Sequence, residues 1–422
     1  MHHLYEIALF FEPPAFHRHP WTLLQMVASA PTLRKLSVSG LRLSGSFTSL
    51  NGIAPLKYLD YMALKTDPIE NAAPDMLVLS SLLRAIHMTV ETLLLSAPFV
   101  SLPLIQHLEW PRLHTFTVRG QTTPSPPAPY ARVFSNMSCL RRLSLDVLLD
   151  AKALDITSAP TSLAPFPWPE LEHLSLPVPL PEDDQMYGQL PHTLRSLAVL
   201  CNPLHIFATH DFSLPHPYAK NPSPPLSPVT ASLLRRCAAS PGLRLSKLEI
   251  EYRASSHRSD DVLPLVAALF PHLEELTIYR YRPSHGDGYS DELAHETAAA
   301  VMEPLAALAA LRVLRAHLDF DFRPDPLQVF SEIRFSTTCR WNPKDNVFRY
   351  GTMRDVALVT ARQLAPALKE VWLWMLGAYE FGPGWWEVFV VERATAGGGE
   401  EDKYVNVRQE REVVNPRPFT FG

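Results

Sequence analysis

Leu140-Arg-Arg-Leu143-Ser-Leu145 places apolar residues at the first, fourth and sixth positions of a six-residue phrase. The same arrangement returns in ten other copies, with Val, Ile, Phe, Tyr or Ala in place of some leucines. These copies begin at Leu33, Leu56, Val90, Leu113, Leu171, Leu194, Leu245, Leu273, Leu311 and Leu368. Successive copies start 23 to 57 residues apart, and most spacings lie within or near the period of a leucine-rich repeat, about 20–29 residues. The sequence is therefore typical of a repeat protein.

Alternation of the last three apolar positions predicts a short strand with one face in a core and the other in solvent. Parallel strands need a crossover between them, and the spacers supply helices. We expect helices at residues 21–29, 74–87, 228–239, 260–270, 291–310 and 352–365. The predicted fold class is α/β: a leucine-rich-repeat solenoid with parallel strands on the concave face and irregular helices and loops on the convex face. The alternative is chance recurrence of the phrase in another leucine-rich α/β fold.

The chain divides into a lead-in with a first helix at 1–32, the repeat array at 33–376 and a C-terminal region at 377–422. Proline accounts for 41 of 422 residues, about twice the usual ~5%, and a proline-rich insertion falls near 205–228. The C-terminal region predicts a hairpin that caps the open edge of the sheet. Four tryptophans are expected as an aromatic plug beneath it, or alternatively as an aromatic cradle for a ligand: Trp372, Trp374, Trp385 and Trp386.

The charge balance disfavours two classes of partner. Lysine and arginine number 38 against 43 acids, a net charge of −5, so no overall positive field exists to hold nucleic acid or an anionic membrane. The four cysteines lie at least 36 residues apart and form neither a disulfide framework nor a CxxC pair. This spacing favours a reducing compartment, the cytoplasm or the nucleus. The apolar runs at 4–11 and 298–314 are broken by charge or proline, so neither predicts a leader or a membrane helix.

Sequence motifs of catalysis are missing: there is no GxxxxGK[ST], no GxSxG and no HExxH, and no GxGxxG after a strand. His17 and His19 have no further ligands nearby in the sequence for a metal site. Asp319 and Asp321 alternate as they would on a solvated strand face. We therefore expect neither an enzyme nor a metal or other cofactor.

The residues between the core positions carry the functional prediction, because parallel strands align them in columns on the concave surface. The early copies lean basic and the later ones acidic or mixed. Arginine and tyrosine are common at protein interfaces, so this surface predicts protein binding, and the alternative is a hydrated face with nothing bound. The expected contact residues are Arg34, Lys35, Tyr58, Arg119, Arg141, Arg142, Arg195, Glu274, Glu275 and Tyr279.

Phrases such as LRRLSLDV at Leu140–Val147, LEHLSLP at Leu171–Pro177 and LEELTIYR at Leu273–Arg280 resemble the leucine-rich-repeat region of fungal F-box proteins. The resemblance extends over the repeat array and its proline-rich spacers. It implies a substrate-recognition role in a Skp-cullin ubiquitin ligase, with the target held by the concave face and loops. The family's F-box, a helical segment before the repeats, has no counterpart in the residues that precede Leu33, so a Skp-type adaptor is expected only if an F-box lies upstream.

Two other roles stay open at this point. A free-standing repeat protein, acting as a scaffold or inhibitor without ligase coupling, fits the lack of an F-box. A GTPase-activating protein of the leucine-rich type would have regular repeats and a strongly acidic tail, whereas residues 387–412 hold only a mild excess of acids.

Overall fold

All eleven phrases fold as short strands, and the chain is an α/β protein whose strands are mostly parallel. The computed structural model describes residues 4–10, 26–39, 52–62, 73–120, 130–147, 166–177, 185–200, 225–255, 261–281, 291–318, 351–375, 385–394 and 404–414. Within these ranges there are fourteen strands and seven α-helices. The first, fourth and sixth residues of every copy are at most 3% exposed, which confirms the predicted core positions.

The structure divides into two compact units, each described by itself. Unit 1 comprises Met1–Arg195, Ser240–Leu243 and Thr420–Gly422. Its strands are β1 (Glu6–Phe10), β2 (Lys35–Ser39), β3 (Tyr58–Met62), β4 (Thr92–Ser96), β5 (Thr115–Gly120), β6 (Arg142–Val147) and β7 (His173–Pro177). They pair in parallel in chain order. Its helices are α2 (Ala73–Ile86), α3 (Leu102–His107) and α4 (Tyr130–Val133), with 3-10 turns η2 (Ala97–Phe99) and η3 (Gln185–Gln189).

Unit 2 comprises Ser196–Ala239 and Arg244–Phe419. Its parallel strands are β8 (Ser196–Leu200), β9 (Lys247–Arg253), β10 (Glu275–Tyr281), β11 (Val313–His317) and β12 (Glu370–Met375). Next to β12, β13 (Trp385–Ala394) and β14 (Tyr404–Val414) form an antiparallel hairpin. The helices are α6 (Ser227–Ala238), α7 (Val262–Leu269), α8 (Asp291–Met302) and α11 (Met353–Gln363), with the 3-10 turn η5 (Glu303–Ala307).

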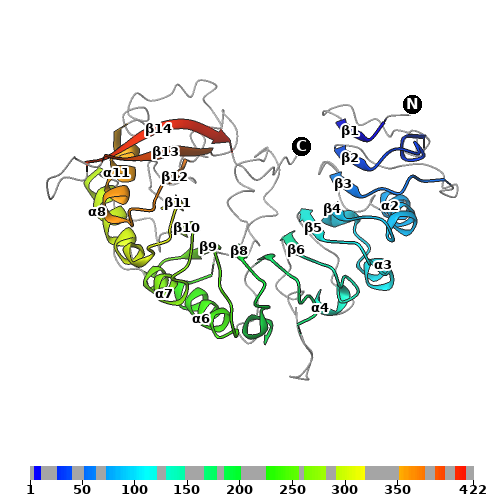
Figure 1. Cartoon of the computed structure of the whole chain (residues 1–422), viewed down its shortest axis with the longest axis horizontal. Coiled ribbons are helices and arrows are strands. Elements are labelled where there is room, and N and C mark those ends of the chain that lie inside the picture. The colour runs from blue at the N-terminus through cyan, green and yellow to red at the C-terminus, as the bar shows by residue number, and fades with distance from the viewer. Residues whose placement is uncertain are drawn as a thin grey trace, which may run out of the picture. The chain divides into compact units, whose positions relative to one another are not determined.

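The helices of each unit lie on one side of its strands, as Figure 1 shows for α2, α3 and α4 and again for α6, α7 and α8. Between strands and helices the leucine columns are joined by buried tryptophans whose indole N–H groups find partners. The indole of Trp110 donates to the carbonyl of Ile105 at 3.1 Å, and that of Trp168 donates to the carbonyl of Phe134 at 2.9 Å. These bonds satisfy the polar end of a large apolar side chain. Each strand thus has one face committed to the core.

The elements depart from the sequence expectation in several places. Strand β1 lies in the segment expected to hold only a lead-in and a helix, and it pairs with β2. Helices α3 and α4 were not expected. The helix expected over 291–310 ends as an α-helix at Met302, because Pro304 has no amide hydrogen to continue it.

Other sequence expectations lie outside the described residues or only partly within them. Of the helix expected at 21–29, residues 26–29 are described, and 26–28 of them are helical. The part of the proline-rich insertion before residue 225 lies outside the described residues. The same holds for His17, His19, Asp319 and Asp321.

Candidate functional site

The residues between the core positions form two separate rows rather than one surface. In most copies, the amides of the second and third residues of a phrase share a single carbonyl of the preceding copy. The amides of Arg141 and Arg142, for example, both donate to the carbonyl of His114 at 2.9 Å. These shared bonds lie where the strands begin, so the second residue of a phrase precedes the regular pairing and the third residue starts it. We call the second residues of the phrases the edge row, because they precede the strands. We call the strand residues that alternate with the core the front face.

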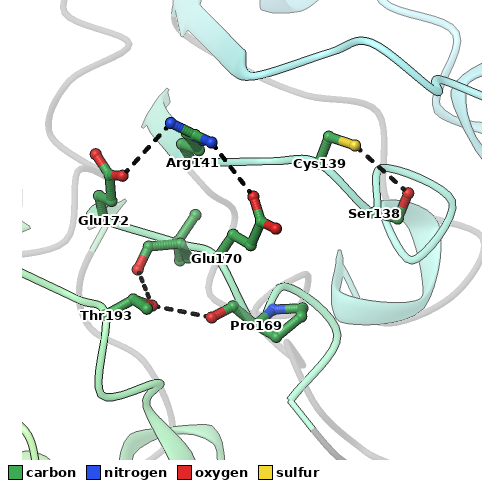
Figure 2. A network of polar contacts seen from close by, with 8 residues as sticks. Ser138, Cys139, Arg141, Pro169, Glu170, Glu172 and Thr193 are labelled. Carbon is green, nitrogen blue, oxygen red and sulfur yellow. Dashed lines mark hydrogen bonds and ion pairs between the residues drawn. The ribbon is translucent and has the colours of Figure 1, made fainter.

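Four of the sequence-predicted contact residues belong to the edge row: Arg34, Arg141, Arg195 and Glu274. The charges in this row pair with neighbours. Figure 2 shows Arg141 reaching both Glu170 and Glu172, at 3.6 and 3.9 Å. In unit 2, Arg312 and Glu274 lie 3.5 Å apart. All of these side chains are about half exposed, and such surface pairs contribute about 0–1 kcal/mol each.

The front face of unit 1 is the mostly polar and partly exposed side of β2 to β7. It includes Lys35, Ser37, Tyr58, Asp60, Leu94, Thr115, Thr117, Arg119, Arg142, Ser144, Asp146 and Ser175. Parallel pairing brings these residues into rows: Asp60 lies opposite Leu94, Leu94 opposite Thr117, and Thr117 opposite Ser144. Hydroxyl groups therefore follow one another across the central strands, with charges on either side of them.

Asp146 is the best-satisfied charge of the front face. Its Oδ1 accepts hydrogen bonds from the hydroxyls of Ser144 at 2.8 Å and Ser175 at 3.1 Å. Its Oδ2 lies 3.7 Å from Nε of Arg119. Both side chains of this ion pair are mostly buried, with 20% of Arg119 and 13% of Asp146 exposed. Arg119, which the sequence predicted as a contact, is thus anchored by a neighbouring strand.

Asp60 is the least satisfied of the partly buried charges of the front face. The hydroxyl of Tyr58 donates to its Oδ2 across a long 3.5 Å, and its buried Oδ1 has no hydrogen-bond partner among the described residues. Burial raises the pKa of Asp60, while the charge of Arg119 and the bond from Tyr58 oppose the rise without cancelling it. Burial and the negative charge of Asp60 together raise the pKa of Tyr58. The site thus links two predicted residues, Tyr58 and Arg119, through an aspartate that was not predicted.

Arg142 is the free cation of this face. Its side chain is exposed, and it makes no hydrogen bond or ion pair within the part of the chain that the structure describes. It lies in register between Thr115 and His173. Lys35, by contrast, is 3.4 Å from Glu6. Among the predicted contact residues of unit 1, Arg142 is therefore the one whose charge is most available to a partner.

Several of the equivalent positions of unit 2 are buried, and the expected contact residue Tyr279 is one of them. This residue is only 4% exposed and belongs to an apolar cluster that also contains Trp372, Trp374 and Trp386. The rings of Tyr279 and Trp386 meet edge to face with centroids 6.0 Å apart, and those of Trp374 and Trp386 meet in the same way at 5.0 Å. A side chain held in this way fills a core and offers no surface to a partner. The side chain of Trp385 lies outside the described residues.

Glu275, the last predicted residue, lies in a charged network beside this cluster. Its carboxylate is 3.1 Å from Nζ of Lys247 and 3.1 Å from Nη1 of Arg315. The guanidinium of Arg315 stacks on Trp372, 4.5 Å from the ring centroid. Burial would raise the pKa of Glu275, but the two cations outweigh it and the pKa is lowered. The two cations beside Glu275, Lys247 and Arg315, are both paired within unit 2, so this network stabilises the fold of that unit.

Sequence reasoning missed Asp60, Asp146 and the serine donors. Each of them stands on a strand, at a position that alternates with the buried residues of the core. Arg119 lies 27 residues before Asp146 and 59 residues after Asp60 along the chain, so its ion pair with the first and its electrostatic effect on the second could not be predicted from any single phrase.

Within the described ranges, no group of three or more His, Cys, Asp or Glu side chains is placed to hold a metal ion. Nor is any helix of those ranges long and apolar enough to cross a membrane. No known protein-family model matches the chain, and no curated protein is significantly similar to it.

Proposed function

We propose that this chain is a leucine-rich-repeat solenoid that binds another protein on the front face of unit 1 and performs no covalent chemistry. The observation that carries the proposal is the contrast between the two units. Most front-face residues of unit 1 are polar and partly exposed, whereas several equivalent residues of unit 2, such as Tyr279 and Trp374, are buried in an aromatic cluster. The strands of unit 1 are held in place by leucines on their core side, so the opposite, solvated side is a rigid surface for a partner.

The side chains of this platform suit a protein partner. Arginine and tyrosine, which dominate the energetics of protein interfaces, are represented by Arg142 and Tyr58. The serine and threonine hydroxyls between them can donate or accept hydrogen bonds. Arg119 is already held by Asp146, so a partner that bonds to it loses little side-chain entropy.

The finer role rests on the sequence resemblance to F-box proteins. On that basis the chain recognises targets for a Skp-cullin ubiquitin ligase, with the front face of unit 1 holding the target. The alternative is a free-standing scaffold or inhibitor that uses the same face without ligase coupling. Both roles use the front face of unit 1. They differ in whether subunits of the ligase bind to the chain as well.

Affinity capture from a lysate of the source organism, read by quantitative mass spectrometry, tests the proposal. Arg142→Glu should reduce recovery of the specific partner at least about tenfold, because a central interface arginine commonly contributes 2 kcal/mol or more. The matched control is Arg112→Glu, a charge reversal at an exposed residue in the turn before β5. Equal recovery by Arg142→Glu and wild type would contradict binding at this face.

The same capture separates the two finer roles. Skp and cullin subunits recovered together with the front-face-dependent partner support the ligase receptor. A front-face-dependent partner recovered without ligase subunits supports the scaffold.

A further inference from the structure

Three charged groups of the front face of unit 1 are partly buried, and among themselves they leave one negative charge unbalanced; the other two, Lys35 and Arg142, are more open to solvent. Asp60 and Asp146 each carry −1 and Arg119 carries +1, so the sum is −1. Arg119 is within ion-pair distance of Asp146. It acts on Asp60 only through its field, with no bond or ion pair between the two in the described residues. The uncompensated charge is therefore located on Asp60.

The surroundings of Asp60 offer it too few donors. Across β2 its register neighbour is Ser37, and across β4 it is Leu94. Among described residues, its only hydrogen bond comes from Tyr58, at 3.5 Å, and its Oδ1 has none. A buried acceptor without a donor costs free energy that a charged donor would recover.

The residue types around Asp60 also suit a long basic side chain. The ring of Tyr58 and the aliphatic side chain of Leu94 are both half-buried neighbours on the same face. Lysine and arginine lay their methylene stems along apolar surface while the charged head seeks a polar partner. A tyrosine ring adds a favourable contact with the cation. A carboxylate between an aromatic and an aliphatic residue is a suitable end point for such a side chain.

We propose that Asp60, with Tyr58 and Leu94, receives a lysine or arginine side chain of the protein that binds the front face of unit 1. The proposal rests on the proposed function, because it names the chemistry that the same face selects. The basic group would approach Oδ2, the oxygen that faces the hydroxyl of Tyr58 across 3.5 Å. Arg142 then remains to pair with an acidic group of the same partner.

Selection of peptides tests this directly. A phage-displayed library of random dodecapeptides is selected on the full chain, and recovered peptides are counter-screened on Arg142→Glu to identify those that need the front face. We expect these peptides to share a lysine or arginine at one position. A synthetic peptide of that sequence should lose at least about tenfold in affinity when glutamine replaces the basic residue, as expected for a hydrogen bond between charged groups.

The protein side of the test uses an isosteric pair of variants. Asp60→Asn should weaken binding of the basic peptide at least about tenfold and leave the glutamine peptide unaffected. Glu172→Gln, which removes a carboxylate of the edge row, should leave both unchanged. If Asp60→Asn does not fold, the affinities of the wild-type chain for the basic peptide and for its glutamine form still test the inference. Equal affinities would contradict it.

The outcomes separate the inference from the proposed function. Front-face-dependent peptides without a shared basic residue, or a basic peptide that binds Asp60→Asn as tightly as wild type, overturn the inference and leave protein binding in place. Selection that yields no peptide sensitive to Arg142→Glu overturns both.

Discussion

At the scale of single residues, Asp60 shows how a repeat strand can carry a charge that its own fold does not satisfy. The residue occupies a position that serine, threonine or leucine takes in neighbouring strands of unit 1, where Ser37, Leu94 and Thr117 stand. Those side chains need few partners or none. A carboxylate needs several donors, and the desolvation that raises the pKa of Asp60 is the energetic sign that they are missing.

The pH dependence of stability follows from that direction. A carboxyl whose pKa is raised in the folded state binds its proton more tightly there than in the unfolded chain. Its protonation therefore adds to the free energy of unfolding, and this contribution is complete below the pKa of the carboxyl in the unfolded chain, about 3.9. That contribution is lost as pH rises through the higher folded pKa. We expect Asp60→Asn to be at least as stable as wild type at pH 7, and wild type to gain relative to the variant as pH falls toward 4. Urea unfolding of both proteins at the two pH values measures this, and a wild-type advantage that grows with rising pH would contradict it.

Leu143 represents the opposite kind of residue, one that is fully committed to the core. Its side chain is 1% exposed, and its strand neighbours in register are Phe116 and Leu174. Leu143→Ala leaves a cavity and should cost about 2–5 kcal/mol. Ser144→Ala, one residue further on the front face, removes one hydrogen bond to Asp146 and should cost only ~1 kcal/mol.

Chemical denaturation of the two variants gives both values. Equal destabilisation by Leu143→Ala and Ser144→Ala would mean that the assignment of core and front face in β6 is reversed.

At the scale of elements, the helices protect side chains as completely as the strands do. Helix α6 buries Cys237, and this burial raises the pKa of its thiol to about 12. Only the thiolate reacts with alkylating agents. Cys139, near the start of β6, is only partly buried.

Alkylation of the native chain should therefore distinguish the two cysteines. Treatment with iodoacetamide at pH 8, followed by peptide mapping, should modify Cys139 and leave Cys237 intact until denaturant is added. The map also separates these residues from Cys201 and Cys339, which lie outside the described residues. Modification of Cys237 at the rate of Cys139 would show that α6 is not packed as described.

The elements that could be predicted from the sequence were those with a repeated local pattern. The phrase contains its own alternation, so the eleven strands and their buried positions follow from it. Strand β1 was missed because Glu6–Phe10 lacks the full phrase. Helix α4, with four residues, is too short to have a recognisable helical period, and it depends on packing instead.

The candidate site was only partly predictable, because burial of a front-face residue depends on distant parts of the chain. Tyr279 has the sequence character of an exposed strand residue. It is buried because Trp386, more than a hundred residues later, packs against it from β13. Asp60 and Arg119 interact from strands on either side of β4, a relation that only the register of the sheet reveals.

At the scale of the whole molecule, the account assigns different roles to the front faces of two units built from the same phrase. In unit 1 most of the face is polar and partly exposed. In unit 2 part of the face is aromatic and forms a second core next to the hairpin of β13 and β14, with a charged network beside it. The repeat supplies the scaffold in both units, and the residues that alternate with its core decide whether the face stays exposed or packs.

Hydroxyl-radical footprinting of the intact chain tests this division most directly, because tyrosine and tryptophan report side-chain exposure. Tyr5, which is 53% exposed, serves as the internal reference for full reactivity. The account predicts measurable modification of Tyr58 and protection of Tyr279, Trp372, Trp374 and Trp386. Modification of Tyr279 and Trp374 as fast as Tyr58 would contradict it, because the aromatic cluster of unit 2 would then be open to solvent.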